Sequence, residues 1–247
     1  MREWQGKRYW IVGASEGLGL ALARHINAAG AEVILSARSE DRLAEAVAAM
    51  PGRASALPCD VSDSAAVRAA AEAAGRLDGV VFVAGVYWPM RAQDWNADQA
   101  EAMCDVNLTG CVRVIGAALP QMVARAAGHV VITGSLSGFR GLPGAIGYSA
   151  SKAGTMALAE SLYADLRGSG ITVQVGNPGF IRTRLTEKND FKMPFIMEPE
   201  EAAQEMFELM CSDHFKRSFP FLFSLFFRAG QFMPDWMWYR LIGRSQG

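Results

Sequence analysis

Residues 9–19 read YWIVGASEGLG, and this stretch decides how the rest of the chain is interpreted. Its first four residues predict a buried strand over Tyr9–Val12, and a helix is predicted over Gly17–Ala29. The turn between them carries Gly13, Gly17 and Gly19, and a glycine turn at a strand–helix junction suits the pyrophosphate of a dinucleotide. Backbone N–H groups and the helix dipole favour negative charge there. The alternative is a loop that needs glycine flexibility and binds no ligand.

Beyond this stretch, short apolar runs alternate with alanine-rich runs of helical length, which is typical of repeated βαβ units around a parallel sheet. Further strands are predicted at Glu32–Ser36, Ala54–Leu57, Gly79–Val83, His129–Thr133, Ile171–Val175 and Arg217–Phe223. Helices are predicted at Glu40–Met50, from a cap at Ser62 to about Ala74, between Ala97 and Ala127 with a break near residues 107–110, and at Tyr148–Arg167. We expect one α/β domain over residues 1–247, a Rossmann-type doubly wound parallel sheet of about seven strands with helices on both faces.

The composition argues against several other classes of protein. Of the 247 residues, 51% are hydrophobic and 20% charged, which suffices for a large core and argues against disorder. With 24 basic and 25 acidic residues, the net charge of −1 gives no reason to expect nucleic acid as a partner. The cysteines form no CxxC pair and the histidines no HxxxH, so no metal is expected. Without a signal-like N-terminus or a long uncharged apolar run, we expect a cytoplasmic protein.

The end of the second predicted strand normally distinguishes NADP from NAD. An acidic side chain there would hold the ribose 2′-hydroxyl of NAD, whereas a basic one suits the 2′-phosphate of NADP. Here Arg38 can bind a phosphate through its guanidinium, with help from the hydroxyls of Ser39 and Ser15. Glu16 in the glycine turn argues against this, and Arg38 can instead be a solvated surface side chain. We expect NADP(H), with NAD(H) less favoured.

Residues 148–152 read YSASK and carry the most informative pair of side chains. Four residues advance a helix by about 400°, so Tyr148 and Lys152 share one face. An ammonium group beside a phenol favours the phenolate, so we expect Lys152 to lower the pKa of Tyr148 from about 10 toward neutrality. Tyr148 would then serve as a general acid or base. The alternative is a surface tyrosine and lysine on an ordinary helix.

The predicted sheet places further polar residues near this pair. Ser135 follows the fifth strand at the carboxyl edge, where open α/β sheets bind ligands, and its hydroxyl could hold a substrate oxygen. Ser137 is the neighbouring alternative. Asn107 lies at the break in the long helical tract, where it either adds an amide link to a proton relay or is only a helix-breaking residue.

Together these motifs resemble the short-chain dehydrogenase/reductases, in their compact single-domain branch, over roughly residues 7–185. The stretches that carry the resemblance are Gly13–Gly19, Asp60-Val61, Asn107, Ser135, Tyr148, Lys152 and residues 177–183, NPGFIRT. The resemblance implies a catalytic tetrad of Asn107, Ser135, Tyr148 and Lys152. The cofactor contacts expected from the motifs and the resemblance together are Gly13, Ser15, Glu16, Gly17, Leu18, Gly19, Arg38, Ser39, Asp60, Val61, Ala84, Gly85, Tyr148, Lys152, Pro178, Gly179, Ile181 and Thr183.

Three departures from the family pattern are visible. After the fourth strand the chain has FVAG at residues 82–85 where the family often has Asn-Asn-Ala-Gly, so two amides are missing. Val12 stands where a threonine is common. An aromatic tail replaces the usual glycine-rich ending, which leaves the quaternary state open.

The expected function is interconversion of a carbonyl and a secondary alcohol by hydride transfer with NADP(H). Tyr148 would transfer the proton, Ser135 would polarise the oxygen, Lys152 would orient the nicotinamide ribose, and Asn107 would anchor a water relay. The alternative is a non-catalytic dinucleotide-binding sensor or scaffold on the same fold, since a fold does not fix a function.

Two segments bear on the substrate and on partners. Residues 184–199 are expected to form a substrate lid, and its apolar side chains, Phe191 among them, indicate either an apolar small-molecule substrate or core packing. Residues 217–247 form an aromatic extension that is too apolar for a solvated terminus. It can cover its own cleft, contact a second subunit, or attach weakly to a membrane surface with Arg228 and Arg240 at its flanks. We expect it to close the substrate side and contribute to a homo-oligomer, a dimer or tetramer.

Overall fold

A computed structural model describes residues 2–189 and 193–243, which contain one parallel sheet of seven strands. The strand order is β3-β2-β1-β4-β5-β6-β7. The central strands are continuous apolar runs, as expected for strands that are covered on both faces. Their bounds are β1 Arg8–Val12, β2 Glu32–Ser36, β3 Ala54–Ala56, β4 Gly79–Phe82, β5 Gly128–Thr133, β6 Ile171–Pro178 and β7 Lys216–Phe219.

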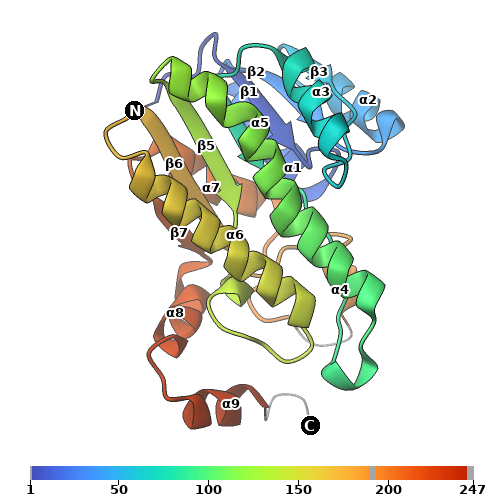
Figure 1. The fold of residues 1–247 in the computed structure, drawn as a ribbon, viewed down its shortest axis with the longest axis vertical. Coiled ribbons are helices and arrows are strands. Elements are labelled where there is room, and N and C mark those ends of the chain that lie inside the picture. The colour runs from blue at the N-terminus through green and yellow to red at the C-terminus, as the bar shows by residue number, and fades with distance from the viewer. Residues whose placement is uncertain (1, 190–192, 244–247) are drawn as a thin grey trace.

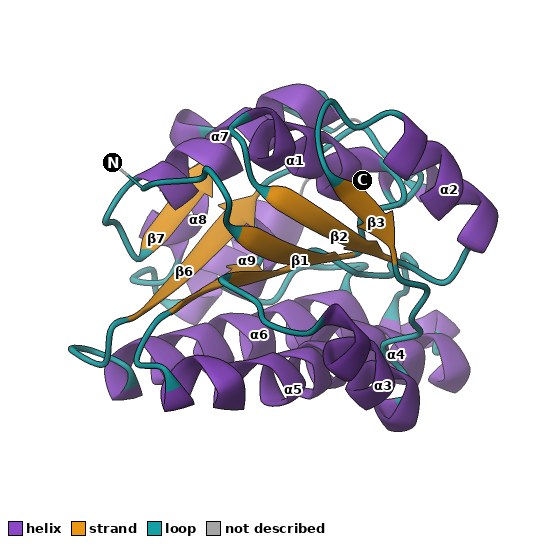
Figure 2. Ribbon diagram, turned by 90° about the horizontal axis from the view of Figure 1, so that it is seen from above, coloured by secondary structure: helices purple, strands orange, loops and turns teal. Residues whose placement is uncertain are grey.

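Helices cover both faces of the sheet (Figure 2), and each face has its own hydrophobic core. One layer holds α3 (Ser64–Ala74), α5 (Gly110–Ala124) and α6 (Ile146–Asp165). The other holds α1 (Gly17–Ala28), α2 (Glu40–Ala48) and α7 (Pro199–Cys211). The predicted doubly wound α/β fold is therefore confirmed.

The strand order changes direction between β1 and β4, because β2 and β3 lie on one side of β1 and the later strands on the other. The chain leaving β1 enters α1 on one face, whereas the chain leaving β4 leads through α4 (Ala97–Cys104) to α5 on the opposite face. Two connections that diverge in this way leave a crevice at the carboxyl ends of the strands, which is where open α/β sheets bind ligands.

A π-helical turn, Asp105–Thr109, joins α4 to α5. The predicted break at this point is thus a widened turn within a continuous helix, and Asn107 is buried in it. By length and composition alone, Ala97–Ala124 is apolar enough to cross a bilayer. Its α5 half nevertheless packs Val114 and Ile115 into the core beneath the sheet, so this is a core helix.

The chain after residue 198 differs from the prediction in two places. The prediction omits α7, although Pro199 in its first turn and a capping box between Glu198 and Glu201 are sequence signals of a helix start. β7 ends at Phe219 rather than Phe223, because Pro220 has no N–H to donate to a ladder.

The tail forms two short helices, α8 (Phe221–Gly230) and α9 (Asp235–Gly243), at one end of the molecule (Figure 1). They make a small core of their own against the loop that joins β5 to α6. Its buried members are Leu136, Phe227, Trp238 and Ile242.

Candidate active site

The glycine turn is as tight as its sequence predicts. Gly13 has a φ of 95°, and a Cβ added to it would lie 2.4 Å from the main-chain nitrogen of Ala84. A Cβ on Gly19 would lie 2.0 Å from the carbonyl oxygen of Gly13, so the helix can pack this closely on the strand only with glycine there. Gly17, at a φ of 55°, faces Thr183 across the crevice, where a Cβ would meet the Thr183 methyl group at 3.0 Å.

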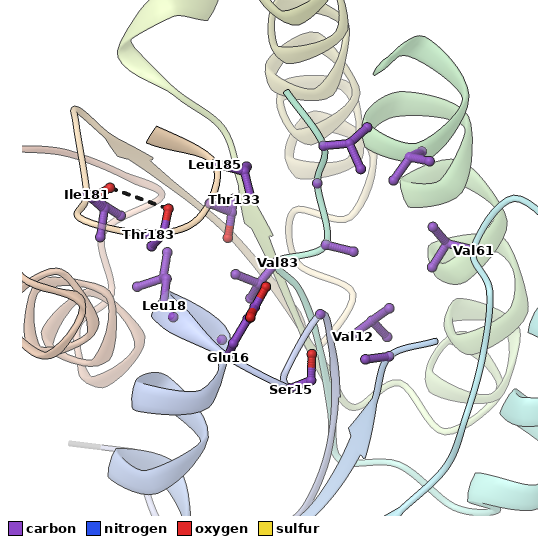
Figure 3. A pocket seen from close by; sticks show the side chains of 18 of the residues that line it. Val12, Ser15, Glu16, Leu18, Val61, Val83, Thr133, Ile181, Thr183 and Leu185 are labelled. Atoms are coloured by element: carbon purple, nitrogen blue, oxygen red, sulfur yellow. Dashed lines mark hydrogen bonds between the residues drawn. The ribbon is translucent and has the colours of Figure 1, made fainter. Parts of the chain in front are cut away.

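A cavity of about 310 Å³ opens at this turn (Figure 3). Ser15 and Glu16 of the turn and Thr183 of the segment after β6 lie around it. All of the expected cofactor contacts line it. They are Gly13, Ser15, Glu16, Gly17, Leu18, Gly19, Arg38, Ser39, Asp60, Val61, Ala84, Gly85, Tyr148, Lys152, Pro178, Gly179, Ile181 and Thr183.

Two arginines reach this cavity from the end of β2 and the start of α2. Arg38 is exposed and forms no ion pair or hydrogen bond among the described residues. Arg42, which the sequence reasoning missed, also lines the cavity and pairs with Glu16 at 3.2 Å. Arg184 pairs with the same carboxylate at 3.1 Å. The acid that argued against a phosphate site is therefore itself neutralised by two guanidinium groups.

Asp60 is held in place after β3. Its Oδ1 accepts hydrogen bonds from the main-chain N–H and the hydroxyl of Ser62, at 2.9 Å and 2.7 Å. Although burial disfavours the charge, these bonds and the positive charge of Arg38 hold the pKa of Asp60 below its usual value. Ser62 is thus engaged with Asp60, and Asp63 caps α3 instead, which corrects the predicted cap.

Tyr148 and Lys152 lie one turn apart on α6, with the Lys152 ammonium 5.8 Å from the centre of the Tyr148 ring. Lys152 is buried and donates a hydrogen bond to the carbonyl oxygen of Thr133 at 2.9 Å. Ser135, just past β5, lies near enough to Tyr148 for its hydroxyl to favour the phenolate and so lower the Tyr148 pKa. Ser137, the neighbouring alternative, donates its hydroxyl to Ser135 Oγ at 2.9 Å and so supports Ser135.

The expected lowering of the Tyr148 pKa toward neutrality is wrong, because the pKa lies above its usual value. Burial raises the pKa of Tyr148, and the hydrogen bond with Ser135 only partly offsets that increase. Burial also lowers the pKa of Lys152 to about 8. Helical spacing brought the two groups together as expected. Their desolvation, which is invisible in the sequence, penalises the charged form of each and outweighs the attraction of an ammonium for a phenolate.

The side-chain amide of Asn107 bonds Val86 and Ser151 rather than Tyr148 or Lys152. Its Oδ1 accepts from Val86 N at 2.7 Å, and its Nδ2 donates to Val86 O and to Ser151 Oγ, each at 3.0 Å. A Cβ on Gly85 would lie 3.3 Å from Asn107 Oδ1 and 4.0 Å from Lys152 Nζ, so Gly85 lies beside both side chains. Asn107 therefore clamps the strand-end loop against α6.

The ends of β1 and β4 stay connected although the two asparagine amides common in the family after β4 are missing. The main-chain N–H groups of Val83 and Ala84 both donate to the carbonyl oxygen of Val12, at 2.8 Å and 2.9 Å. Phe82 is fully buried in the core. Backbone bonds and apolar packing thus hold this loop without the two amides.

The segment after β6 forms the opposite wall of the cavity. Thr186, also missed in the sequence, donates from its hydroxyl to the carbonyl oxygen of Ile181 at 2.6 Å and accepts from Thr183 N at 3.0 Å. These bonds close a compact turn beside Gly17. Of the predicted lid, Phe191 lies outside the described residues, and the lid role of residues 184–199 stays a prediction.

The short-chain dehydrogenase family model matches residues 7–193. The chain belongs to this family. This short-chain dehydrogenase is 35% identical over 243 residues to a Myxococcus xanthus protein described as an uncharacterized oxidoreductase, covering 95% of this chain and 96% of that one. It is also 32% identical to an uncharacterized oxidoreductase of Staphylococcus epidermidis, over 73% of this chain and 80% of that protein.

Solved structures agree with this family assignment. A short chain dehydrogenase/reductase family protein superposes with a TM-score of 0.79 at 30% identity, covering 84% of this chain and 91% of that one. A variant of actinorhodin polyketide ketoreductase, solved with NADPH, has a TM-score of 0.77 at 25% identity and covers 85% of this short-chain dehydrogenase and 92% of its own chain. The protein is an oxidoreductase of a family that uses nicotinamide dinucleotides.

Proposed function

We propose that this short-chain dehydrogenase interconverts a carbonyl and a secondary alcohol with NADP(H), on an apolar small molecule. The observation that carries the proposal is the meeting of Ser135, Tyr148 and Lys152 beside a cavity that also holds Arg38 and Arg42. Tyr148 is the group that transfers the proton, and Ser135 and Lys152 support it. The two arginines supply the charge that a 2′-phosphate requires.

Several features of the cavity support a phosphorylated nicotinamide dinucleotide as its ligand. Gly17 at the start of α1 presents no Cβ toward Thr183 on the opposite wall, and the backbone N–H groups of a helix start favour a phosphate. Arg38 has a free guanidinium, and the buried hydroxyl of Thr133 lines the cavity without a hydrogen-bond partner among the described residues. Arg38 with Ser39 and Ser15 would hold the 2′-phosphate, Asp60 and Val61 the adenine, and Lys152 the nicotinamide ribose.

The bound nucleotide would supply or accept the hydride. In the direction of reduction, Tyr148 donates its phenolic proton to the carbonyl oxygen, and Ser135 holds that oxygen by a hydrogen bond. Because burial raises the pKa of Tyr148, the phenol stays protonated at neutral pH and is ready to act as the acid. Asn107 is a positioning residue, since its amide holds Val86 and Ser151.

The remaining expectations stay predictions. The lid at residues 184–199, the homo-oligomer and the cytoplasmic location each need a direct measurement, of which sedimentation velocity for the oligomer is the simplest. Preference for NADP(H) over NAD(H) rests on Arg38 and Arg42 alone.

The test is a panel of ketones and secondary alcohols of increasing apolar length, assayed by the absorbance of NADPH and, in parallel, of NADH. We expect turnover with NADPH on at least one apolar member, and none with the Tyr148→Phe variant. Tight NADPH binding without turnover of any member would instead favour the dinucleotide-binding sensor.

A further inference from the structure

The two tail helices have one buried face and one exposed apolar face. Phe227 and Trp238 point into the small core beneath them, and Gly230 lets the Trp238 ring pack closely, since a Cβ there would lie 2.4 Å from it. Outside this core, the two helices and the turn between them expose a set of large apolar side chains. This aromatic face consists of Phe221, Leu222, Leu225, Phe226, Phe232, Trp236, Met237, Tyr239 and Leu241.

The side chains of the aromatic face are more exposed than is usual for large apolar residues that contact no partner. Phe232 is 89% exposed, Leu222 is 70% exposed and Trp236 is 69% exposed. Single exposed apolar residues are ordinary, but eight on two consecutive helices and a ninth, Phe232, in the turn between them are a concentration that marks an interaction site. The buried side of the same helices shows that they are a folded element and not a frayed end.

The charges on the tail identify the kind of partner. Between Phe219 and Gly243 the chain has one acid, Asp235, and Arg140 of the β5–α6 loop neutralises it in an ion pair. Arg228 and Arg240 are exposed and form no ion pair among the described residues. Trp, Tyr, Phe and Leu beside free arginines are the composition of helices that lie in a membrane interface, where arginine stems extend along apolar surface toward lipid phosphates.

A second copy of the chain fits this face less well. In a two-fold contact, the same surface would face itself. Arg228 and Arg240 would then be desolvated beside apolar side chains and beside each other. Among the described residues of the tail, no unpaired carboxylate is present to compensate, since Asp235 pairs with Arg140. A lipid surface with anionic headgroups offers both an apolar layer and negative charge.

Packed rings connect the aromatic face to the cavity wall, since Phe226 contacts Phe227 and Phe227 contacts Phe223. Phe223 of α8 lies against Gly179, where a Cβ would approach its ring to 3.1 Å, and stacks with Phe195 of residues 184–199 at 5.4 Å. Leu136, which follows Ser135 directly, packs against Phe223 in the tail core. Figure 1 shows α8 and α9 beyond the end of the sheet, next to the loop that joins β5 to α6. Apolar side chains therefore lead from the aromatic face to the catalytic serine.

We propose that the aromatic face docks on an anionic lipid surface and that the cleft receives from it an amphiphilic carbonyl or alcohol with a long apolar chain. The docking stands on the tail alone, whereas the substrate class rests on the proposed function. The two parts therefore have separate tests.

Docking is tested by sedimenting the intact protein with vesicles of phosphatidylcholine mixed with phosphatidylglycerol, and with vesicles of phosphatidylcholine alone. We expect binding to the mixed vesicles that weakens with added salt. The double variant F232S/W236S should lose at least about tenfold in vesicle affinity, because each ring loses its apolar burial. R228Q/R240Q should lose about tenfold on mixed vesicles only.

The matched control is V112S/V123S, which changes two exposed apolar side chains of α5 and should bind as the unchanged protein does. Failure to sediment with mixed vesicles overturns the docking. So does a dimer in sedimentation velocity that dissociates in F232S/W236S, since the face would then be a subunit interface.

The substrate class is tested with the same F232S/W236S variant. Its turnover of a short, water-soluble ketone should be unchanged, whereas turnover of a long-chain ketone supplied in mixed vesicles should fall about tenfold. Equal turnover of the vesicle-borne ketone by both proteins overturns this part. If the unchanged protein turns over neither ketone but still binds vesicles, the proposed function fails and the docking stands.

Discussion

The ammonium of Lys152 donates a hydrogen bond to the carbonyl oxygen of Thr133 across 2.9 Å, which ties the start of α6 to the carboxyl end of β5. The same contact fixes where Tyr148 and Ser135 lie, because each is within a few residues of one partner. The arrangement that we propose for catalysis thus depends on a buried ammonium group bonded to the main chain. Because burial disfavours the charged form of this ammonium group, the same arrangement lowers the pKa of Lys152 to about 8.

Tyr148→Phe should reduce turnover by about 10²–10⁴, because it keeps the ring and removes the only proton that the phenol can transfer. NADPH affinity, measured by fluorescence titration, should be largely retained. Tyr163→Phe makes the same change on the outer side of the same helix and serves as the control. Undiminished turnover in the Tyr148 variant would refute its role as proton donor.

Alcohol oxidation should rise with pH in the alkaline range, since it needs the phenolate and burial raises the pKa of Tyr148 above its usual value. The hydrogen bond from Ser135 lowers that pKa, so Ser135→Ala should move the alkaline limb of the rate profile to still higher pH. The position of the limb, rather than its height, is the quantity to compare. Ser137→Ala should move it less, and an unmoved limb in Ser135→Ala would contradict the contact.

Arg38→Ala should weaken NADPH binding by about 1.5–3 kcal/mol and leave NADH binding nearly unchanged, because a charge-assisted bond to the 2′-phosphate is lost. Glu16→Gln should tighten NADPH binding, since it removes a carboxylate and releases Arg42 from its ion pair. Calorimetric titrations with both nucleotides measure these differences. An equal loss of both nucleotides in Arg38→Ala would show that Arg38 does not contact the 2′-phosphate; Arg68→Ala, outside this cavity, is the control.

Gly19→Ala should destabilise the fold by about 1–3 kcal/mol and impair nucleotide binding, because its methyl group would collide with the Gly13 carbonyl. The control is Gly116→Ala on α5, where a Cβ meets nothing within 4 Å. There alanine should be neutral or stabilising by up to about 1 kcal/mol. Urea unfolding of the two variants would distinguish them, and equal stabilities would rule out the tight packing at Gly19.

His129 should make the fold sensitive to acid. Its ring lies between Tyr9 and Gln174, and burial lowers its pKa to about 3. Between about pH 6.5 and that value the unfolded state binds more protons than the folded state, so stability falls as the pH falls, by up to about 1.4 kcal/mol per pH unit. His129→Gln should flatten this dependence in urea unfolding, whereas His214→Gln, at an exposed site, should not. An unchanged slope in His129→Gln would contradict the assignment.

Structural features that involve only a few neighbouring residues can be predicted from the sequence. The glycine turn and the Tyr148–Lys152 spacing each fall within one strand–helix junction or one helical turn, so residue order alone predicts their geometry. Pro220 and the capping box around Pro199 were also local signals, and weighing them would have corrected the end of β7 and added α7.

Features that depend on burial or on distant partners could not be predicted. The sign of the Tyr148 pKa shift follows from how much water the fold excludes. The pairing of Glu16 with Arg184 joins residues 168 positions apart, and the clamp of Asn107 on Val86 and Ser151 joins three elements. No periodicity or spacing in the chain marks these contacts.

The π-helical turn at Asp105–Thr109 also limits how this chain can vary in length. Each residue of a helix turns the next by about 100°, so losing one residue here would rotate α5 relative to α4 by that angle. Either Val114 would leave the core beneath the sheet or Asn107 would leave its clamp. In descendants of this sequence, insertions and deletions within residues 105–109 should therefore be as rare as substitutions of Asn107 itself.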